Sequence, residues 1–110
     1  MTIKNVDFSV TDWDRMLVTE YEGEEGTSLW RTFEEGNVRV RMVEYSPGFK
    51  SDHFCGRGHV LLVLRGELTI KLKDGRMFTL LEGTSFQVSN DNKNPHLAYT
   101  KKGAQVFIVD

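Results

Sequence analysis

The sequence predicts an all-β domain, folded as a closed barrel or a jelly-roll sandwich. Two observations carry this prediction. Short segments alternate between apolar and polar residues, the period of a strand with one buried face. Glycine-containing turns separate these segments at short intervals. About seven to nine short strands of this kind are typical of a double-layered or closed β architecture.

Alternation is clearest over residues 66–81, where every second residue is apolar: Leu68, Ile70 and Leu72. Asp74-Gly75 then predicts a tight hairpin turn, because glycine tolerates a positive φ. The return strand follows over residues 77–81.

Four further segments complete the predicted set of strands. Residues 37–45 alternate and end at Ser46-Pro47-Gly48, a turn sequence. Residues 59–64 are apolar at nearly every position, which predicts a strand buried on both faces. Residues 96–100 and 104–109 flank a turn at Lys101-Lys102-Gly103.

A chain of 110 residues is long enough for one domain, so residues 1–110 are assigned to a single domain. Residues 1–35 form an N-terminal extension that we expect to pack on the barrel or on a dimer partner. Its aromatic residues, and the need to protect sheet edges, predict a homodimer: Phe8, Trp13, Tyr21 and Trp30.

Charge and cysteine content exclude several partners. The formal net charge is −2 and no basic run occurs, so neither nucleic acid nor a membrane surface is an expected partner. No apolar stretch is long enough for a membrane span. The single cysteine, Cys55, cannot form an intramolecular disulfide, and a cytoplasmic location is the expectation.

The three histidines and the cysteine fall into one pattern. His53 and Cys55 are two residues apart, so in a strand they leave the same face. His59 follows beyond two glycines that permit a bend, and His96 begins a later strand. A single histidine is more often a surface residue, and a single cysteine a small buried one. Together they predict one site for a divalent transition metal, with Zn, Fe, Ni or Cu suited to imidazole and thiolate.

This pattern resembles the cupin family, whose first motif is a glycine-bounded His-x-His followed by a glutamate. The matching residues are His53, Cys55, His59 and the closing Gly66, and residues 75–96 resemble the second motif with its single histidine. The run Asp52-His53-Phe54-Cys55 with Gly58-His59 is similar to the DHCW-motif subgroup of small cupins. The resemblance covers residues 30–110 and implies a double-stranded β-helix, the cupin jelly-roll barrel.

Three departures from the cupin motifs bear on the ligand set. Cys55 stands where cupins usually carry a second histidine, and His59 where they usually carry the carboxylate. Leu81 replaces the usual proline of the second motif, and two extra residues precede His96. Four bound side chains would make a closed structural site, whereas three would leave a position for water or substrate.

Three other residues are candidates for binding a substrate. Arg39 and Arg41 alternate with Val38, Val40 and Met42. If the valines fill the core, the arginines face solvent; otherwise they line the cavity and bind a carboxylate. Gln87, in a later strand, is either a donor in the pocket or an exposed strand residue.

Taken together, these residues predict a metal-binding cupin that takes a small-molecule ligand. A metalloenzyme of the oxygenase, isomerase or hydrolase type is the first hypothesis, with no catalytic residue assigned. A non-catalytic ligand- or metal-binding module is the second, and a protein with a closed structural metal site is the third.

Overall fold

The fold is built almost entirely of β-strands in the computed structural model, which describes residues 1–90 and 93–110. One short 3-10 turn, η1 (Trp13–Arg15), precedes the first strand. The described residues form eight strands: β1 (Thr19–Glu22), β2 (Thr27–Glu35), β3 (Val38–Tyr45), β4 (His59–Leu72), β5 (Met77–Leu81), β6 (Ser85–Val88), β7 (His96–Tyr99) and β8 (Ala104–Val109). The all-β prediction is confirmed.

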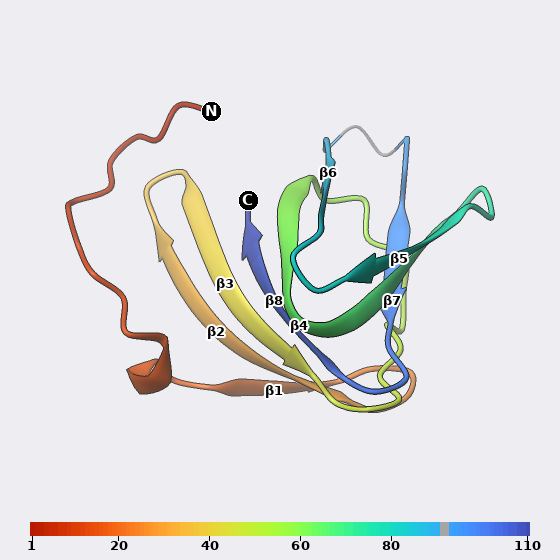
Figure 1. Ribbon diagram of the computed structural model, residues 1–110. Helices are drawn as coiled ribbons and strands as arrows, with labels where there is room; N and C mark the ends of the chain where they lie inside the picture. The colour runs from red at the N-terminus through yellow and green to blue at the C-terminus, as the bar shows by residue number, and fades with distance from the viewer. Residues whose placement is uncertain (91–92) are drawn as a thin grey trace.

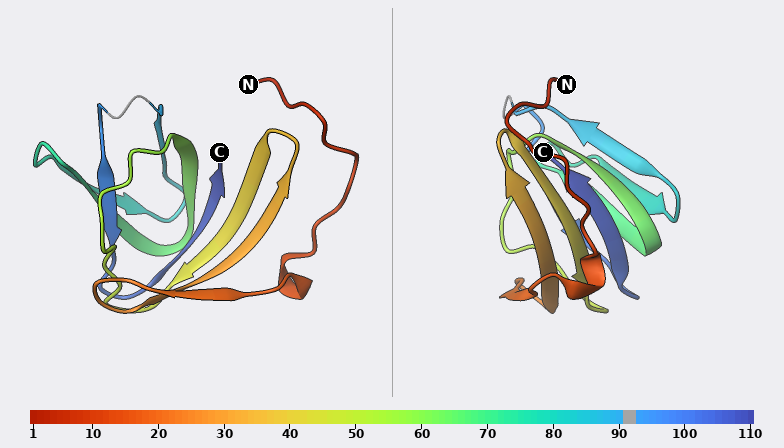
Figure 2. Two further views of the ribbon diagram at one scale, coloured as in Figure 1. Left: turned by 180° about the vertical axis from the view of Figure 1, so that it is seen from behind. Right: turned by 90° about the vertical axis from the view of Figure 1, so that its left-hand side faces the viewer.

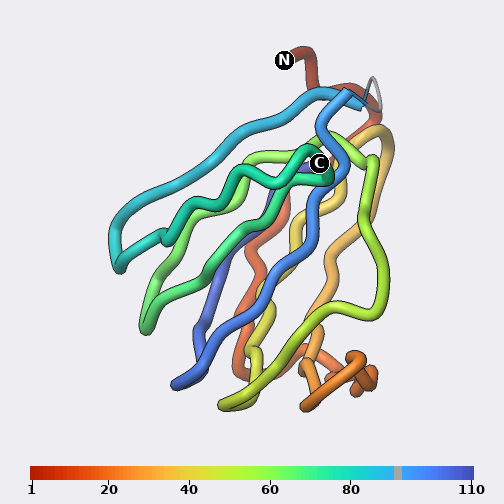
Figure 3. The backbone as a smooth tube through the Cα atoms, turned by 90° about the vertical axis from the view of Figure 1, so that its right-hand side faces the viewer, coloured from red at the N-terminus to blue at the C-terminus, as the bar shows by residue number. Residues whose placement is uncertain are grey.

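Strand β4 belongs to two sheets. Its first half pairs with β8 and β6, and through β8 it joins β3, β2 and β1 to form sheet A. Its second half pairs with β5 and β7 to form sheet B. Every pairing is antiparallel, and β4 curls from one sheet into the other (Figure 1). Seen from the side of β5 and β7, sheet B lies in front of β2 and β3 (Figure 3).

β4 curls at Gly66. This residue has φ 76°, a backbone conformation that glycine adopts without strain. A side chain here would overlap the carbonyl oxygen of Gly103, in the turn just before β8, so the close approach of β4 to the start of β8 also requires glycine. The pairing of β4 with β8 shifts register between Val63 and Arg65, and such a bulge increases the local bend.

The apolar core lies between the two sheets. Val43, Val106 and Val63 occupy one row across β3, β8 and β4, and all three are fully buried. Leu68 and Ile70 of β4 close the core from sheet B. Burying such side chains contributes about 1.5–3 kcal/mol each, and this row fixes which face of each strand points inward.

The predicted turns are confirmed. Asp74 caps the β4–β5 hairpin by accepting hydrogen bonds from the backbone and side chain of Arg76, and Gly75 has φ 100°. The amide of Phe49 donates to the carbonyl of Ser46 and closes the turn after β3. Gly103, with φ 99°, ends the turn before β8.

The prediction that residues 59–64 are buried on both faces is wrong for Val60, which is 44% exposed. Val60 lies in an outward row with Val109 of β8 and Val40 of β3. Met42, Phe107 and Leu62 form the next outward row. The outer face of sheet A is therefore apolar although it is not part of the core.

The N-terminal segment, residues 1–18, forms an arm outside sheet A (Figure 2). Asn37, in the β2–β3 turn, holds the beginning of this arm by two hydrogen bonds. Its side chain accepts one from the Lys4 amide and donates one to the Thr2 carbonyl. Further along, Trp13 packs edge-on against Phe107, with ring centroids 6.1 Å apart. Between and beyond these contacts, the arm exposes large apolar side chains: Phe8 at 97%, Val10 at 84% and Leu17 at 91%.

We predict that replacing Leu68 by alanine lowers the free energy of unfolding by about 2–5 kcal/mol, because the side chain is fully buried and leaves a cavity. Urea denaturation followed by circular dichroism measures this. Leu81→Ala is the matched control: Leu81 lies on the partner strand β5 but is exposed, so the expected change is within about 0.5 kcal/mol. Equal losses in the two variants would contradict the assigned core.

Candidate functional site

Two histidines meet inside the barrel. His59 begins β4, whereas His96 begins β7 and pairs with Leu72 at the far end of β4. Because β4 curls, these distant positions face each other, and the Nε2 atoms of the two rings lie 3.1 Å apart. The rings are nearly perpendicular, with an interplanar angle of 87°.

Both imidazoles are largely buried, and Phe86 of β6 packs edge-on against each of them. Burial, helped by the nearby His96 and Arg41, lowers the pKa of His59 to about 4. Burial also lowers the pKa of His96, against the opposing effect of the Asn94 carbonyl near its Nδ1. Both rings are therefore neutral at neutral pH, the state in which a ring nitrogen can accept a hydrogen bond or bind a metal.

Cys55 lies beside His96. The two residues exchange both backbone hydrogen bonds, at 2.7 and 2.9 Å, in an isolated antiparallel bridge. Residues directly opposite each other in such a bridge place their side chains on the same face. The thiol is partly buried and its Sγ accepts a hydrogen bond from the Arg57 amide at 3.4 Å.

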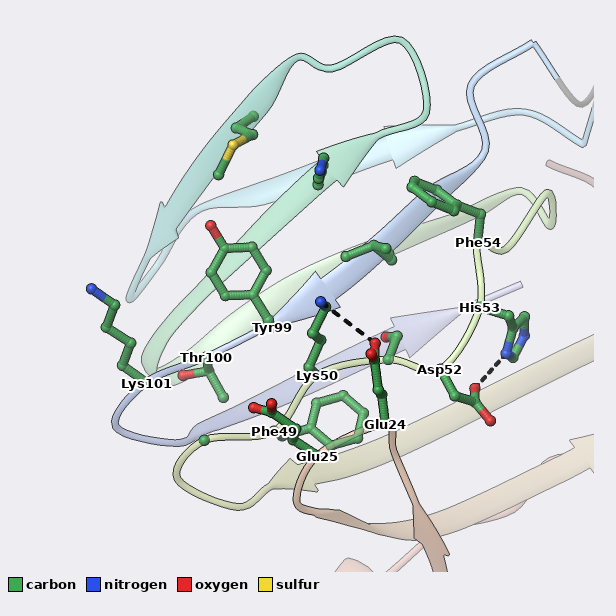
Figure 4. Close-up of a pocket in the computed structure, with 15 residues that line it drawn as sticks. Glu24, Glu25, Phe49, Lys50, Asp52, His53, Phe54, Tyr99, Thr100 and Lys101 are labelled. Carbon is green, nitrogen blue, oxygen red and sulfur yellow. Dashed lines mark hydrogen bonds and ion pairs between the residues drawn. The ribbon is translucent and has the colours of Figure 1, made fainter.

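His53 lies apart from the histidine pair. Its side chain is 75% exposed, and its Nδ1 is 2.6 Å from the Asp52 carboxylate. Figure 4 shows this pair at the edge of a second cavity of about 570 Å³, next to a further ion pair between Lys50 and Glu24. The chain bends at His53 instead of continuing as a strand, so the parity argument from the sequence does not apply here.

A buried carboxylate, Asp110, lies behind His59. Its Oδ2 is 3.7 Å from His59 Nδ1, which is buried and has no hydrogen-bond partner. Arg39 donates to both carboxylate oxygens, at 2.9 and 3.0 Å. Burial by itself raises the pKa of Asp110, but the hydrogen bonds from Arg39 and the charges of Arg41 and Arg57 outweigh it, so the pKa lies below its usual value.

Arg41 and Arg57 also reach this carboxylate. The Nη2 of Arg41 donates to Oδ2 at 2.7 Å, and the Nε of Arg57 lies 3.2 Å from the same oxygen. Arg41 is buried, its guanidinium carbon stands 4.7 Å above the Trp30 ring, and its Nε has no partner. Burial lowers the pKa of Arg41.

The three histidines, Cys55, the three arginines and Trp30 line one cavity of about 700 Å³. Asp110 is buried beneath them and is not part of the lining. The apolar wall of the cavity includes Leu61, Phe86 and Ile108. Of the residues selected from the sequence, His53, Cys55, His59, His96, Arg39 and Arg41 contribute to the lining. The arginines thus face inward, and the outward side of β3 carries Val40 and Met42. Gln87 alternates with Phe86, is exposed, and pairs with Val60 in the outward row, so the structure does not bring it to the cavity.

Sequence reasoning missed Asp110 and Arg57. Asp110 directly follows the alternating segment that became β8. It is two residues after the buried Ile108, so in an extended strand both side chains point to the same, inward face. This parity was a usable signal. Arg57 lies between two glycines in a loop, where no periodicity indicates a direction.

The donor set fits a transition metal in part. Two nitrogens bound to one zinc at about 2.0–2.1 Å in tetrahedral geometry lie about 3.3 Å apart, close to the 3.1 Å between His59 and His96. Cys55 adds a thiol on the same face as His96. Within residues 1–90 and 93–110, however, no three His, Cys, Asp or Glu side chains are grouped closely enough to hold a metal as they stand.

A search of solved structures finds chains of the same fold. An RmlC-like cupin from Shewanella frigidimarina is 17% identical, with a TM-score of 0.74 over 94% of this chain and 89% of its own. A sugar phosphate isomerase of the cupin superfamily from Silicibacter pomeroyi is 18% identical, with a TM-score of 0.69 over 92% and 74%. The Fe(II)-bound enzyme HppE is 16% identical, with a TM-score of 0.72 over 94% and 60%.

Comparisons of the sequence itself find no match, either to a protein-family model or to a curated protein. In the described residues, no helix has the length and apolarity that a membrane span requires. These three structural matches cover 92–94% of this chain. The chain has the cupin fold, as its resemblance to the cupin motifs implied.

Proposed function

We propose that this protein is a metalloenzyme that transforms a small organic molecule in the cavity, by a reaction of the oxygenase, isomerase or hydrolase type. The observation that carries the proposal is the convergence of the His59 and His96 Nε2 atoms, 3.1 Å apart, in the wall of a 700 Å³ cavity. The match to an Fe(II)-bound protein of the same fold supports it. The similarity to the DHCW-motif subgroup and the cytoplasmic location remain predictions.

His59 and His96 would hold the metal, with Cys55 as the third ligand and His53 available at the cavity mouth. A bound divalent metal would supply Lewis-acid or redox chemistry to a small molecule beside it. Asp110 stands behind His59, 3.7 Å from its Nδ1, and a shift that closes this distance would let the carboxylate orient the imidazole. Arg39 and Arg41 hold that carboxylate in place, and Phe86 shields the rings from water.

The exposure of His53 favours this enzyme hypothesis over a closed structural site. A closed site needs four bound side chains, and His53 is turned toward Asp52 at the surface. With three ligands, coordination positions stay open to a substrate. A non-catalytic binding module stays the second candidate, since a cavity with buried charged groups serves binding as well as catalysis.

We predict that protein purified without added metal contains about one transition metal per chain and that His59→Ala and His96→Ala reduce this at least tenfold, because each removes one of the two converging nitrogens. Cys55→Ser reduces it less, since serine retains a weak oxygen donor. Plasma mass spectrometry measures the metal, and circular dichroism verifies folding.

His53→Ala is the matched control for this experiment. The same substitution is made at an exposed histidine in the same cavity lining, so most of the metal is expected to remain. Full metal occupancy in the His59→Ala/His96→Ala double variant would overturn the proposed site. Loss of metal in His53→Ala equal to that in His96→Ala would indicate that the loop at residues 51–58 closes on the metal.

We also propose that the functional form is a homodimer, with the arm and the outer face of sheet A forming the interface. Two outward rows cross this face: Val40, Val109 and Val60, then Met42, Phe107 and Leu62. The arm adds nearly fully exposed Phe8 and Leu17. Val60 is exposed and the other five residues of these rows are half-buried. An apolar face of this kind, beside an arm with exposed apolar side chains, is typical of a surface that a second subunit covers.

We predict that light scattering coupled to size-exclusion chromatography gives twice the chain mass at low micromolar concentration. Replacing Phe8 and Leu17 together by serine removes apolar contact area and shifts the species toward monomer. Phe78→Ser/Leu81→Ser is the control, because these side chains are half exposed on β5, away from the proposed interface. A monomer in the wild type would refute the dimer.

A further inference from the structure

The inner part of the cavity holds more guanidinium groups than carboxylates. Arg39, Arg41 and Arg57 all approach Asp110, at 2.9, 2.7 and 3.2 Å. One carboxylate balances one of these three positive charges. The acidic residues of the cavity lining are exposed to solvent: Glu22, Glu34 and Asp52. Arg39 and Arg41 are much less exposed, so together with Asp110 they leave a net positive side-chain charge beside the cavity. Water screens the exposed acids more strongly than it screens these two arginines.

Arg41 lacks a partner for one of its donors. Its side chain is 9% exposed, and its Nε is buried without any hydrogen bond. A buried N–H group without an acceptor is costly, and native proteins rarely leave one unless a ligand or ion supplies the acceptor. Arg41 itself is a residue of the cavity lining, where a ligand oxygen can supply an acceptor to its guanidinium group.

Arg57 offers the second contact. Its side chain is 50% exposed, and its Nε lies 3.2 Å from Asp110 Oδ2. Arg41 and Arg57 meet at the same Asp110 oxygen, Oδ2, so both guanidinium groups lie on one side of the cavity. A group with two oxygens is the shape that such donors recognise best.

The walls near these arginines are apolar or aromatic. Leu61 and Ile108 occupy the same cross-strand row as Arg41, and Phe86 follows on β6. A ligand that satisfies both the donors and these walls carries an anionic group on an apolar body.

We propose that the ligand of this cavity is a small organic carboxylate, whose carboxylate group pairs with Arg41 and Arg57 and whose apolar body packs against Phe86, Leu61 and Ile108. The three arginines already hold a planar carboxylate, that of Asp110, which favours a second carboxylate over a tetrahedral phosphate. This inference rests on the proposed function for its cavity and names the substrate class.

Isothermal titration of the 110-residue chain tests it with three probes that share a phenyl ring: benzoate, benzamide and phenyl phosphate. Benzoate is expected to bind at least about tenfold more tightly than benzamide, because only the charged probe pairs with the guanidinium groups. Equal binding of benzoate and benzamide, or binding of neither at 10 mM (about the weakest affinity that titration detects), would overturn the proposal. Tighter binding of phenyl phosphate than of benzoate would replace the carboxylate by a phosphate.

Variants locate the contact. Arg57→Gln and Arg41→Gln are each expected to weaken benzoate binding about tenfold or more, and unchanged affinity in Arg57→Gln would overturn the proposal. Arg65→Gln is the matched control, because Arg65 lies outside the cavity lining and pairs with Glu44 and Gln105. Arg57 is half exposed, so its variant decides the question even if Arg41→Gln does not fold.

The titration is run on both chelator-treated and metal-loaded protein, which separates this inference from the proposed function. Benzoate binding to the chelator-treated chain, with no metal retained by the purified protein, would support the carboxylate site and reject the metalloenzyme. If the protein binds metal but neither the chelator-treated nor the metal-loaded form binds benzoate, the metal site would be supported and the carboxylate site rejected.

Discussion

The curl of β4 at Gly66 is the constraint on which the rest of the molecule depends. β4 pairs with strands of both sheets, and His96, which pairs with Leu72 at the end of β4, meets His59 at its start. A side chain at residue 66 would collide with Gly103, just before β8. The contact between His59 and His96 therefore depends on the curl that this glycine permits.

The barrel is divided into an apolar half and a charged half, and cross-strand register determines the boundary. Val43, Val106 and Val63 fill one row, whereas two residues along β3 the row contains Arg41 and Ile108. Two residues further along β3, Arg39 lies opposite Asp110, and the two residues are joined by a pair of backbone hydrogen bonds as well as by their side chains. Burying an ion pair costs more than it returns in stability unless its hydrogen bonds are satisfied. Burying the charged groups beside the cavity therefore lowers the stability of the fold, and the apolar half of the barrel offsets this loss.

Much of the fold could be predicted from the sequence because strand period and turn chemistry are local. Alternation at Leu68 and Ile70 gave the buried face of β4, and Asp74-Gly75 gave its hairpin. The inward direction of Arg39 and Arg41 could not be decided locally, because it depends on which face of β3 meets the core. The same limit applies to Val60, whose outward direction follows from its register with Val109.

The site was predictable only as a set of residue types. His59 and His96 meet because of a tertiary bend, and no spacing in the sequence encodes their 3.1 Å separation. His53 shows the opposite case: its spacing from Cys55 suggests a shared face, but the loop turns before the strand begins. Asp110 could have been found from its parity with Ile108, whereas Arg57 is recognised only from its contact with the Asp110 carboxylate in the folded chain.

The stacking of Arg41 on Trp30 has a spectroscopic consequence. The two indoles of the chain lie in different surroundings, Trp13 against Phe107 outside sheet A and Trp30 beneath a guanidinium inside the barrel. Indole emission shifts with charges held close to the ring, so movement of Arg41 changes the fluorescence of Trp30 and leaves that of Trp13 unaltered. The fluorescence of Trp30 therefore reports on the interior of the barrel. In a Trp13→Phe variant it is the only tryptophan emission.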